Sequence, residues 1–200
     1  MTSEARNRGH LVLVMGGARS GKSAFAQRLA MQHGGATLFV ATGQARDREM
    51  ASRIEQHRKD RPKGWRTLEL DCDVGQGLPS NLAGIDVVIV DCITLLVSNA
   101  LMRLVGERDV EAALEAESQE AERLVMGEVE GLLGCVGEHR ACFIVVSNEV
   151  GLGLVPDNRL GRVYRDLLGR ANQVLAGAAH EVYFLTAGLP IQVKPAPSLR

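Results

Sequence analysis

The chain has 200 residues, of which 46% are hydrophobic and 24% charged, and its formal net charge at pH 7 is -1. This length predicts one soluble domain over residues 1–200, because a second domain would lack residues for its own core. A nearly neutral chain argues against nucleic acid as the main partner, which would require a basic face. The longest apolar run, 87–97, contains Asp91 and is too short to span a membrane. The polar start has no signal-peptide pattern, so we expect a cytoplasmic protein with a peripheral or disordered extension at 1–9.

Short apolar runs alternate with longer segments of helical periodicity. Strands are predicted at residues 11–15, 37–41, 87–90, 142–147 and 181–186. Helices are predicted at residues 22–32, 46–59, 93–104, about 109–134 and 159–179. The turn-rich segment 75–84 is interpreted as a plain surface connection. The alternation predicts a single α/β domain with a mostly parallel sheet and helices on both faces.

A phosphate-binding pattern follows the first predicted strand and opens the first predicted helix. The octet fits G-x-x-x-x-G-K-[ST] and consists of Gly16, Gly17, Ala18, Arg19, Ser20, Gly21, Lys22 and Ser23. Its backbone N–H groups are expected to cradle phosphates, with Lys22 on the β- and γ-phosphates and the Ser23 hydroxyl on Mg²⁺. Arg19 is either a further phosphate contact or an exposed side chain. The pattern and its flanks predict a P-loop NTPase-type, RecA-like fold that binds a nucleoside triphosphate.

Asp91 closes the apolar run 87–90. A carboxylate at the end of a buried strand is where P-loop proteins hold Mg²⁺, often through a water. A strand-end acid can also cap the helix that follows. Both roles remain open for Asp91.

His57 lies in the helical pattern at 46–59. Met50, Ile54 and His57 share one helix face because of their i, i+4, i+7 spacing. A histidine in this setting is more often packed or partly exposed than catalytic. However, the end of the helix is rich in cations that suit a polyphosphate, and neutral imidazole is a capable nucleophile toward phosphorus. These cations are Arg58, Lys59, Arg61 and Lys63.

A polar block, Ser147 to Gly153, follows the strand predicted at 142–147, and Pro156 to Arg159 lead into a helix. Polar residues at the carboxyl end of a strand face the ligand crevice of an open α/β sheet. The same residues are equally compatible with a connecting loop and a helix N-cap. The sequence leaves these alternatives open.

Taken in order, these motifs resemble one enzyme family. They are GGARSGKS at 16–23, ATGQ at 41–44, HRKDRPKGWRT at 57–67, VDCIT at 90–94 and SNEVGLGLVPDNRLGRVYRDLLGRANQ at 147–173. The family is the bifunctional adenosylcobinamide kinase and adenosylcobinamide-phosphate guanylyltransferase of cobalamin biosynthesis. The resemblance runs from about residue 11 to 194 and is weak only at 70–85 and 102–141. Some relatives have Glu where this chain has Asp91, and a second His where it has Gln56.

The resemblance implies two reactions on adenosylcobinamide. ATP or GTP phosphorylates its aminopropanol hydroxyl, and GTP then guanylylates an enzyme histidine that passes GMP to adenosylcobinamide phosphate. The family's guanylylated histidine matches His57. The resemblance also implies that the protein assembles as a homotrimer. Its nucleotide contacts match the octet at 16–23 together with Thr42, Gly43, Gln44, Lys59, Asp60, Arg61, Pro62, Glu69 and Asp91.

Two other functions compete with this interpretation. One is a P-loop kinase of another small metabolite, in which His57 is structural. The other is a GTP-binding switch that acts through a partner. The absence of an Asn-Lys-x-Asp guanine-reading motif from the sequence counts against the switch.

Overall fold

The computed structural model of the chain describes residues 9–45, 48–59, 61–106, 108, 113 and 117–195, without the side chains of Glu49, Arg53 and His57. Within these residues lies a seven-stranded sheet in the order β3-β2-β4-β5-β1-β6-β7. Six strands are parallel, and β7 pairs antiparallel with β6. The strands are β1 (His10–Gly16), β2 (Thr37–Ala41), β3 (Arg66–Glu69), β4 (Val87–Asp91), β5 (Cys142–Val146), β6 (Glu181–Thr186) and β7 (Leu189–Lys194). The predicted fold class, an α/β domain with a mostly parallel sheet, is confirmed.

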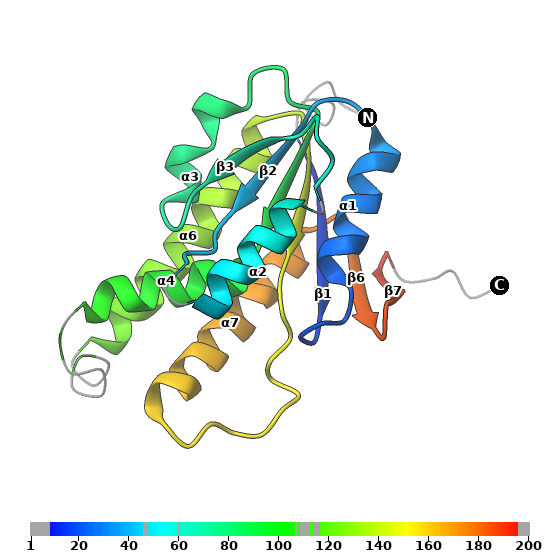
Figure 1. Cartoon of the computed structure of the whole chain (residues 1–200). Coiled ribbons are helices and arrows are strands. Elements are labelled where there is room, and N and C mark those ends of the chain that lie inside the picture. Colours follow the sequence, from blue (N-terminus) through cyan, green and yellow to red (C-terminus); the bar gives the residue numbers. More distant parts are fainter. Residues whose placement is uncertain are drawn as a thin grey trace.

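Helices cover both faces of the sheet, as Figure 1 shows. On one face α1 (Lys22–His33) buries Phe25, Ala26 and Ala30 against alternate residues of the central strands. On the other face lie α3 (Val74–Gly77), α4 (Ile93–Val105), α6 (Ser118–Glu138) and α7 (Arg159–Ala178), whose buried side chains form one cluster with the opposite residues of the strands. Because the central strands are covered twice, every residue of β5 is buried.

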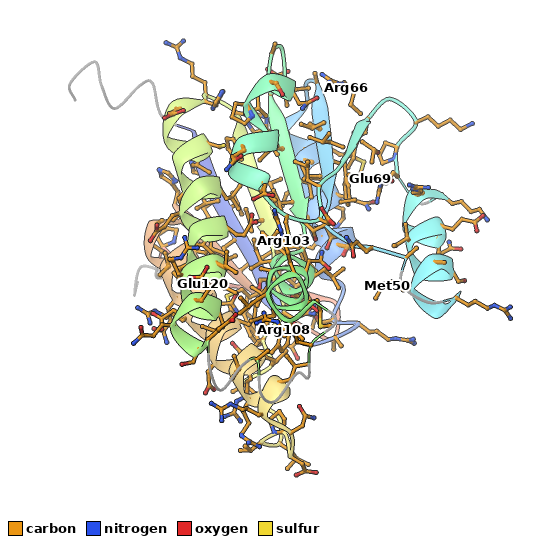
Figure 2. All side chains as sticks on the ribbon, turned by 90° about the vertical axis from the view of Figure 1, so that its left-hand side faces the viewer. Met50, Arg66, Glu69, Arg103, Arg108 and Glu120 are labelled. Atoms are coloured by element: carbon orange, nitrogen blue, oxygen red, sulfur yellow. The ribbon has the colours of Figure 1, made fainter. Side chains whose placement is uncertain are left out.

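The helix α2 (Arg48–Lys59) has a different position. Figure 2 shows α2, with Met50 labelled, at one side of the molecule and apart from the layer that contains α4 and α6. Of its described side chains only Met50 and Ile54 are partly buried, and the others are exposed. Among the described side chains of α2, few therefore pack against the rest of the domain.

The segment interpreted as a plain surface connection, 75–84, was wrongly predicted. It contains most of α3 and a short 3-10 helix, Pro79–Asn81. Val74, Leu78 and Leu82 are buried, and their spacing of four residues places them on one side. The carboxylate of Glu128 accepts N–H groups at the start of α3, 2.5 Å from Asp73 N and 3.1 Å from Val74 N, so a distant helix supplies its cap.

Two smaller differences concern element boundaries. The helix expected at about 109–134 is α6, which ends four residues later at Glu138, and much of 107–116 lies outside the described residues. The strands β3 and β7 at the two edges of the sheet were not predicted. In the part of the chain that the structure describes, no helix is both long and apolar enough to cross a membrane.

A cluster of titratable side chains lies at the amino edge of the sheet, where β1 and β6 begin. The rings of His10 and His180 stack with centroids 4.6 Å apart, and His10 Nε2 lies 2.8 Å from a carboxylate oxygen of Glu181. The backbone N–H of Leu11 donates to His180 Nδ1 over 3.0 Å, so this nitrogen carries no proton. Tyr183 donates to the other Glu181 oxygen over 2.6 Å. These groups tie β1 to β6 at the edge opposite the phosphate loop.

Candidate functional site: a phosphate loop at the carboxyl edge of the sheet

The predicted phosphate loop lies between β1 and α1. Gly16 and Gly21 have φ angles of 146° and 93°, which L side chains rarely adopt. A Cβ on Gly16 would also clash with the Leu185 carbonyl and lie 2.8 Å from Ser20 Oγ. Gly188, in the turn after β6, donates its N–H to the Ser20 carbonyl over 3.0 Å. Gly16 and Gly21 are thus required by the path of the backbone, which the end of β6 and the turn after it hold in place.

The Lys22 side chain folds back into the loop. Its Nζ lies 2.5 Å from the Gly17 carbonyl and 3.5 Å from Ser20 Oγ, and the residue is only 7% exposed. Burial lowers the pKa of Lys22, while the charge of Asp91 opposes this shift. Ser23 follows at the N-terminus of α1 and is half-buried, whereas Ala18 and Arg19 are exposed. The loop is therefore closed around an ammonium that a phosphate oxygen can bind in place of the carbonyl.

Asp91 is the last residue of β4 and lies in register with Ala41 of β2 and Val146 of β5. Since only β5 separates β4 from β1, its carboxylate stands one strand away from the phosphate loop. Its charge raises the pKa of Lys22 and of Arg61 against the effect of burial on each. Asp91 therefore lies between two cations at the carboxyl edge.

The backbone beside Asp91 is fixed by Thr42. The Thr42 hydroxyl donates to the Cys92 carbonyl over 2.7 Å and accepts the Cys92 N–H over 2.8 Å. Asn99 of α4 donates to the carbonyls of Thr42, at 2.8 Å, and Asp71, at 3.0 Å. The Thr42 side chain is fully buried, so it supports the segment that ends β2 rather than presenting its hydroxyl to solvent.

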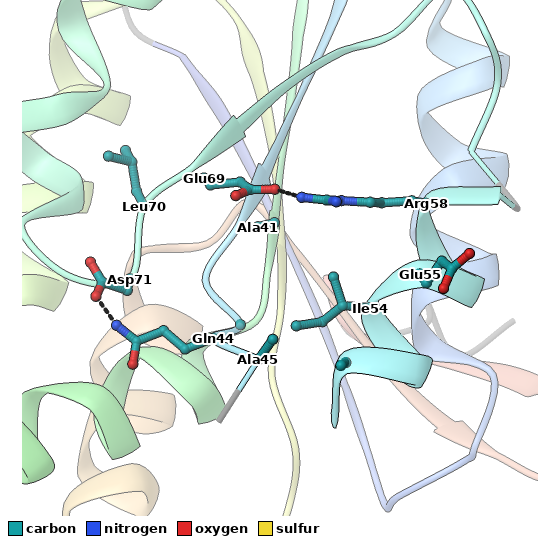
Figure 3. A pocket seen from close by; sticks show the side chains of 11 residues that line it. Ala41, Gln44, Ala45, Ile54, Glu55, Arg58, Glu69, Leu70 and Asp71 are labelled. Atoms are coloured by element: carbon teal, nitrogen blue, oxygen red, sulfur yellow. Dashed lines mark hydrogen bonds and ion pairs between the residues drawn. The ribbon is translucent and has the colours of Figure 1, made fainter. Parts of the chain in front are cut away.

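A pocket of about 530 Å³ opens next to this segment, between α2 and the ends of β2 and β3. Gly43 and Gln44 line it, and Gln44 donates to the Asp71 carboxylate. Figure 3 shows Arg58 of α2 reaching toward Glu69 at the end of β3, with which it forms an ion pair. Three expected nucleotide contacts, Gly43, Gln44 and Glu69, therefore line the same pocket as α2.

Arg61 follows α2 and lies over the ring of Phe39, with its guanidinium carbon 3.8 Å from the ring centroid. Its Nη1 donates to the Thr67 hydroxyl over 3.3 Å, and its Nε is buried without a hydrogen-bond partner. Burial lowers the pKa of Arg61. A half-buried guanidinium with an unused N–H suits an incoming anion.

The remaining expected contacts after α2 are less well defined. Lys59 is exposed and forms an ion pair with Glu55 at 2.9 Å, and Pro62 is half-buried and accepts the Trp65 N–H over 3.1 Å. Asp60 and the side chain of His57 lie outside the described residues, while the backbone of His57 belongs to α2.

A buried polar network supports the start of the loop between β5 and α7, residues 147–158. Ser147 Oγ donates to Asn172 Oδ1 over 2.6 Å, and Asn172 Nδ2 donates to the Asn148 carbonyl over 3.0 Å. The Asn148 N–H donates to the Thr94 hydroxyl over 2.9 Å, and Glu149 N–H donates to the Gly16 carbonyl over 3.1 Å. The loop start is thereby joined to α4, α7 and the phosphate loop.

This network was not predicted from the sequence, and neither were the hydrogen bonds that Asn99 makes to the ends of strands. Asn99 and Asn172 are single asparagines within helical patterns, and nothing local marks them as partners of strand ends. The only available signal was a polar residue on an otherwise apolar helix face, which predicts a buried hydrogen bond without naming its partner.

The fold and the loop define the class of the protein: it is an α/β protein of the P-loop type, with its phosphate loop and a strand-end carboxylate at one edge of a parallel sheet. Residues 12–193 match the family described as "Cobinamide kinase / cobinamide phosphate guanyltransferase". The chain belongs to this family. The family resemblance noted in the sequence is confirmed.

Curated relatives agree with this assignment. The chain is 39% identical to the Escherichia coli (strain K12) "Bifunctional adenosylcobalamin biosynthesis protein CobU", over 92% of this chain and 99% of the relative. It is 40% identical to the Salmonella typhimurium protein of the same name, with the same coverage. It is 42% identical to the Pseudomonas aeruginosa "Bifunctional adenosylcobalamin biosynthesis protein CobP", over 92% of this chain and 98% of the relative.

Proposed function

We propose that this chain carries out both reactions of its family, phosphorylation of adenosylcobinamide and guanylylation of the product. The observation that carries the proposal is a phosphate loop already closed around Lys22, within a chain that matches the family over residues 12–193. In the first reaction the substrate hydroxyl attacks the γ-phosphorus of ATP or GTP. A P–O bond to the substrate forms, the hydroxyl proton is released to solvent, the bond to the β-phosphate oxygen breaks, and the nucleoside diphosphate leaves with the negative charge.

Lys22 and the backbone of residues 16–23 would hold the phosphates in both reactions. The Lys22 ammonium would exchange the Gly17 carbonyl for a charged phosphate oxygen, which is a stronger acceptor. The N-terminus of α1 adds its partial positive charge to the same place. Arg61 would supply a second cation from the other side of Asp91, since its Nε–H is unused.

The donor set at this edge fits Mg²⁺. A hydroxyl at Ser23 and a carboxylate at Asp91 are oxygen ligands of the kind that this ion prefers, with phosphate oxygens completing its shell. When bound, the ion neutralises developing charge on the phosphates. Asp91 would bind it directly or through water, and its charge also opposes the lowering of the Lys22 pKa by burial.

The second reaction would use His57 as a nucleophile toward the α-phosphorus of GTP. A P–N bond forms, the bond between the α-phosphorus and the bridging oxygen breaks, and pyrophosphate leaves. The phosphate oxygen of the corrinoid then attacks the same phosphorus, the P–N bond breaks, and the imidazole is restored. His57 belongs to α2, and four other residues of this helix line the pocket together with Gly43, Gln44 and Glu69, which supports this role.

The remaining expected contacts are part of the same proposal. Gly43 and Gln44, which follow the buried support residue Thr42, would surround the nucleoside together with Glu69 and the segment Lys59, Asp60, Arg61 and Pro62. Since the substrates are GTP and ATP, we place the enzyme in the cytoplasm. By resemblance to the family we also propose that it assembles as a homotrimer.

The test follows both reactions in two variants. The enzyme is incubated with adenosylcobinamide and ATP, and separately with GTP radiolabelled on its α-phosphate. Lys22→Ala is expected to lower both phosphorylation and labelling by about a hundredfold or more, since it removes a charged contact to the transferring phosphates. His57→Ala is expected to abolish covalent labelling and leave phosphorylation of adenosylcobinamide intact.

The matched control is His33→Ala, which removes an exposed histidine at the end of α1 distant from the phosphate loop. It should label like the wild type. Wild-type protein that phosphorylates adenosylcobinamide without ever acquiring the label would contradict the guanylylation step alone. Wild-type protein that ignores adenosylcobinamide but phosphorylates another small alcohol would replace the proposal with a different P-loop kinase.

A further inference from the structure

The loop between β5 and α7, residues 147–158, carries apolar side chains that the core does not use. Leu152 is 82% exposed, Leu154 95% and Val155 62%, whereas Val150 packs against the main core. We call Leu152, Leu154 and Val155 the apolar rim. Exposed aliphatic side chains in sequence, on a loop at a ligand-binding edge, indicate a contact surface.

The loop has a defined conformation. At its start Asn148 and Glu149 are bonded to Asn172 and Gly16, and the Gly151 N–H donates to the Glu149 carboxylate over 2.6 Å. At its end Arg162 Nη1 donates to the carbonyls of Pro156, at 3.1 Å, and Asp157, at 2.5 Å, and Asn158 accepts the Gly161 N–H over 2.7 Å as the N-cap of α7. The rim is therefore held out from a loop that is fixed at both ends.

Leu152, the first residue of the rim, lies close to the phosphate loop. Glu149 is bonded to Gly16 of the phosphate loop, and three further residues of extended chain reach at most about 10 Å, so Leu152 is within that distance of Glu149. Figure 1 shows the loop (yellow) leaving the carboxyl edge of the sheet beside the start of α1 and turning below it before α7. The acceptor substrate must approach the γ-phosphate from this open edge.

We propose that the apolar rim binds the corrin macrocycle of the acceptor substrate. This inference rests on the proposed function, which makes that substrate a corrinoid. A corrin ring carries methyl groups and a broad apolar framework around its amide arms, and the hydroxyl to be phosphorylated is on one flexible arm. Leu152 and Leu154 contact the framework, while the arm reaches past Glu149 to the phosphate loop.

The size of the rim favours this occupant over a second copy of the chain. Three aliphatic side chains offer much less than the roughly 800 Å² per partner that a standard protein interface buries. A rigid macrocycle, in contrast, can be oriented by a few aliphatic contacts beside one polar anchor.

The experiment compares the Leu152→Ser/Leu154→Ser double variant with the wild type. Binding of adenosylcobinamide is measured by equilibrium dialysis, and the KM values for adenosylcobinamide and ATP are measured in the phosphorylation assay. Burying one leucine side chain increases binding affinity roughly tenfold. We therefore expect Kd and KM for adenosylcobinamide to rise about tenfold or more in the double variant. The KM for ATP should stay within roughly twofold. The matched control is Met31→Ser, which removes an exposed apolar side chain from the far end of α1 and should change neither constant.

Two outcomes would overturn the proposal. One is an unchanged Kd for adenosylcobinamide in the double variant, including the case in which the wild type does not bind it. The other is dissociation of the oligomer in light scattering with affinity lost only as subunits separate, which would make the rim an interface between copies. Wild-type protein that binds adenosylcobinamide through the rim without phosphorylating it would refute the proposed function and leave this inference standing.

Discussion

The pair Ser147 and Asn172 allows a quantitative test of how the loop after β5 is held. Both residues are buried, with 0% and 4% of their surface exposed, and they are joined by a 2.6 Å hydrogen bond. Asn172→Ala leaves two buried groups without this partner, the Ser147 hydroxyl and the Asn148 carbonyl. An unsatisfied buried group costs about 1–3 kcal/mol, so we expect a loss of about 3 kcal/mol in the free energy of unfolding. For a domain of this size that corresponds to a fall in Tm of roughly 6–12 °C.

A double variant measures how strongly Ser147 and Asn172 are coupled. Ser147→Ala alone removes the donor and leaves the Asn172 carbonyl oxygen without it, at a cost of about 1–2 kcal/mol. In Ser147→Ala/Asn172→Ala both members of the Ser147–Asn172 pair are gone and only the Asn148 carbonyl stays without its partner, so the loss should not exceed about 3 kcal/mol instead of reaching the sum of about 4–5 kcal/mol. The coupling energy is therefore expected to be about 1–2 kcal/mol.

Unfolding is followed by far-UV circular dichroism in urea at one fixed protein concentration, because the stability of an oligomer depends on concentration. Asn81→Ala is the matched control, since the Asn81 amide bonds the Gly77 carbonyl and the Ser80 hydroxyl at the surface of the 3-10 segment. It should cost less than about 1 kcal/mol. Additive losses for Ser147 and Asn172, within about 0.5 kcal/mol, would refute the reasoning.

Two further predictions concern the stability of the protein at low pH and the contact between Arg61 and Phe39. Burial lowers the pKa of His180 below its ordinary value of 6.5, so this group contributes stability that is present above that value and is lost as the pH falls through the lowered folded pKa. The variant His180→Asn keeps an acceptor for the Leu11 N–H. Between pH 7 and pH 5 its free energy of unfolding, from denaturation curves, should fall less than that of the wild type. An identical fall would show that His180 does not cause this loss of stability. Arg61→Lys keeps the charge but not the planar contact with Phe39, so titration should show weaker GTP binding by about tenfold with Tm nearly unchanged; unchanged affinity would exclude Arg61 from the site.

The phosphate loop could be predicted from the sequence because all its parts are contiguous. Eight consecutive residues supply the glycines, the lysine and the helix start, and the run that precedes them, 11–15, is apolar. The position of Asp91 at the end of a buried strand could be predicted for the same reason, because it directly follows the buried residues of β4. Local sequence carries such features without help from distant partners.

The strand β3, in contrast, is not marked by its own sequence. Its sequence is Arg-Thr-Leu-Glu, and only Leu68 is partly buried, so neither alternation nor apolar character marks it as a strand. It exists because Arg66 to Glu69 pair in register with β2, a contact between segments far apart in the chain. The same pairing sets Glu69 opposite Ala41 and so brings it to the pocket. Its place in the site follows from the sheet and not from its neighbours in sequence.

The electrostatics of the assembled site follow from a similar combination of distant segments. Lys22 comes from α1, Arg61 from the segment after α2 and Asp91 from β4, and burial lowers the pKa of both cations. One carboxylate beside two partly desolvated cations leaves an excess of positive charge, which is unfavourable in the free protein. Under the proposed function, an anionic triphosphate would relieve this excess, and part of the free energy lost in bringing the two cations together would be recovered as affinity. Binding of the triphosphate should then raise the stability of the whole domain.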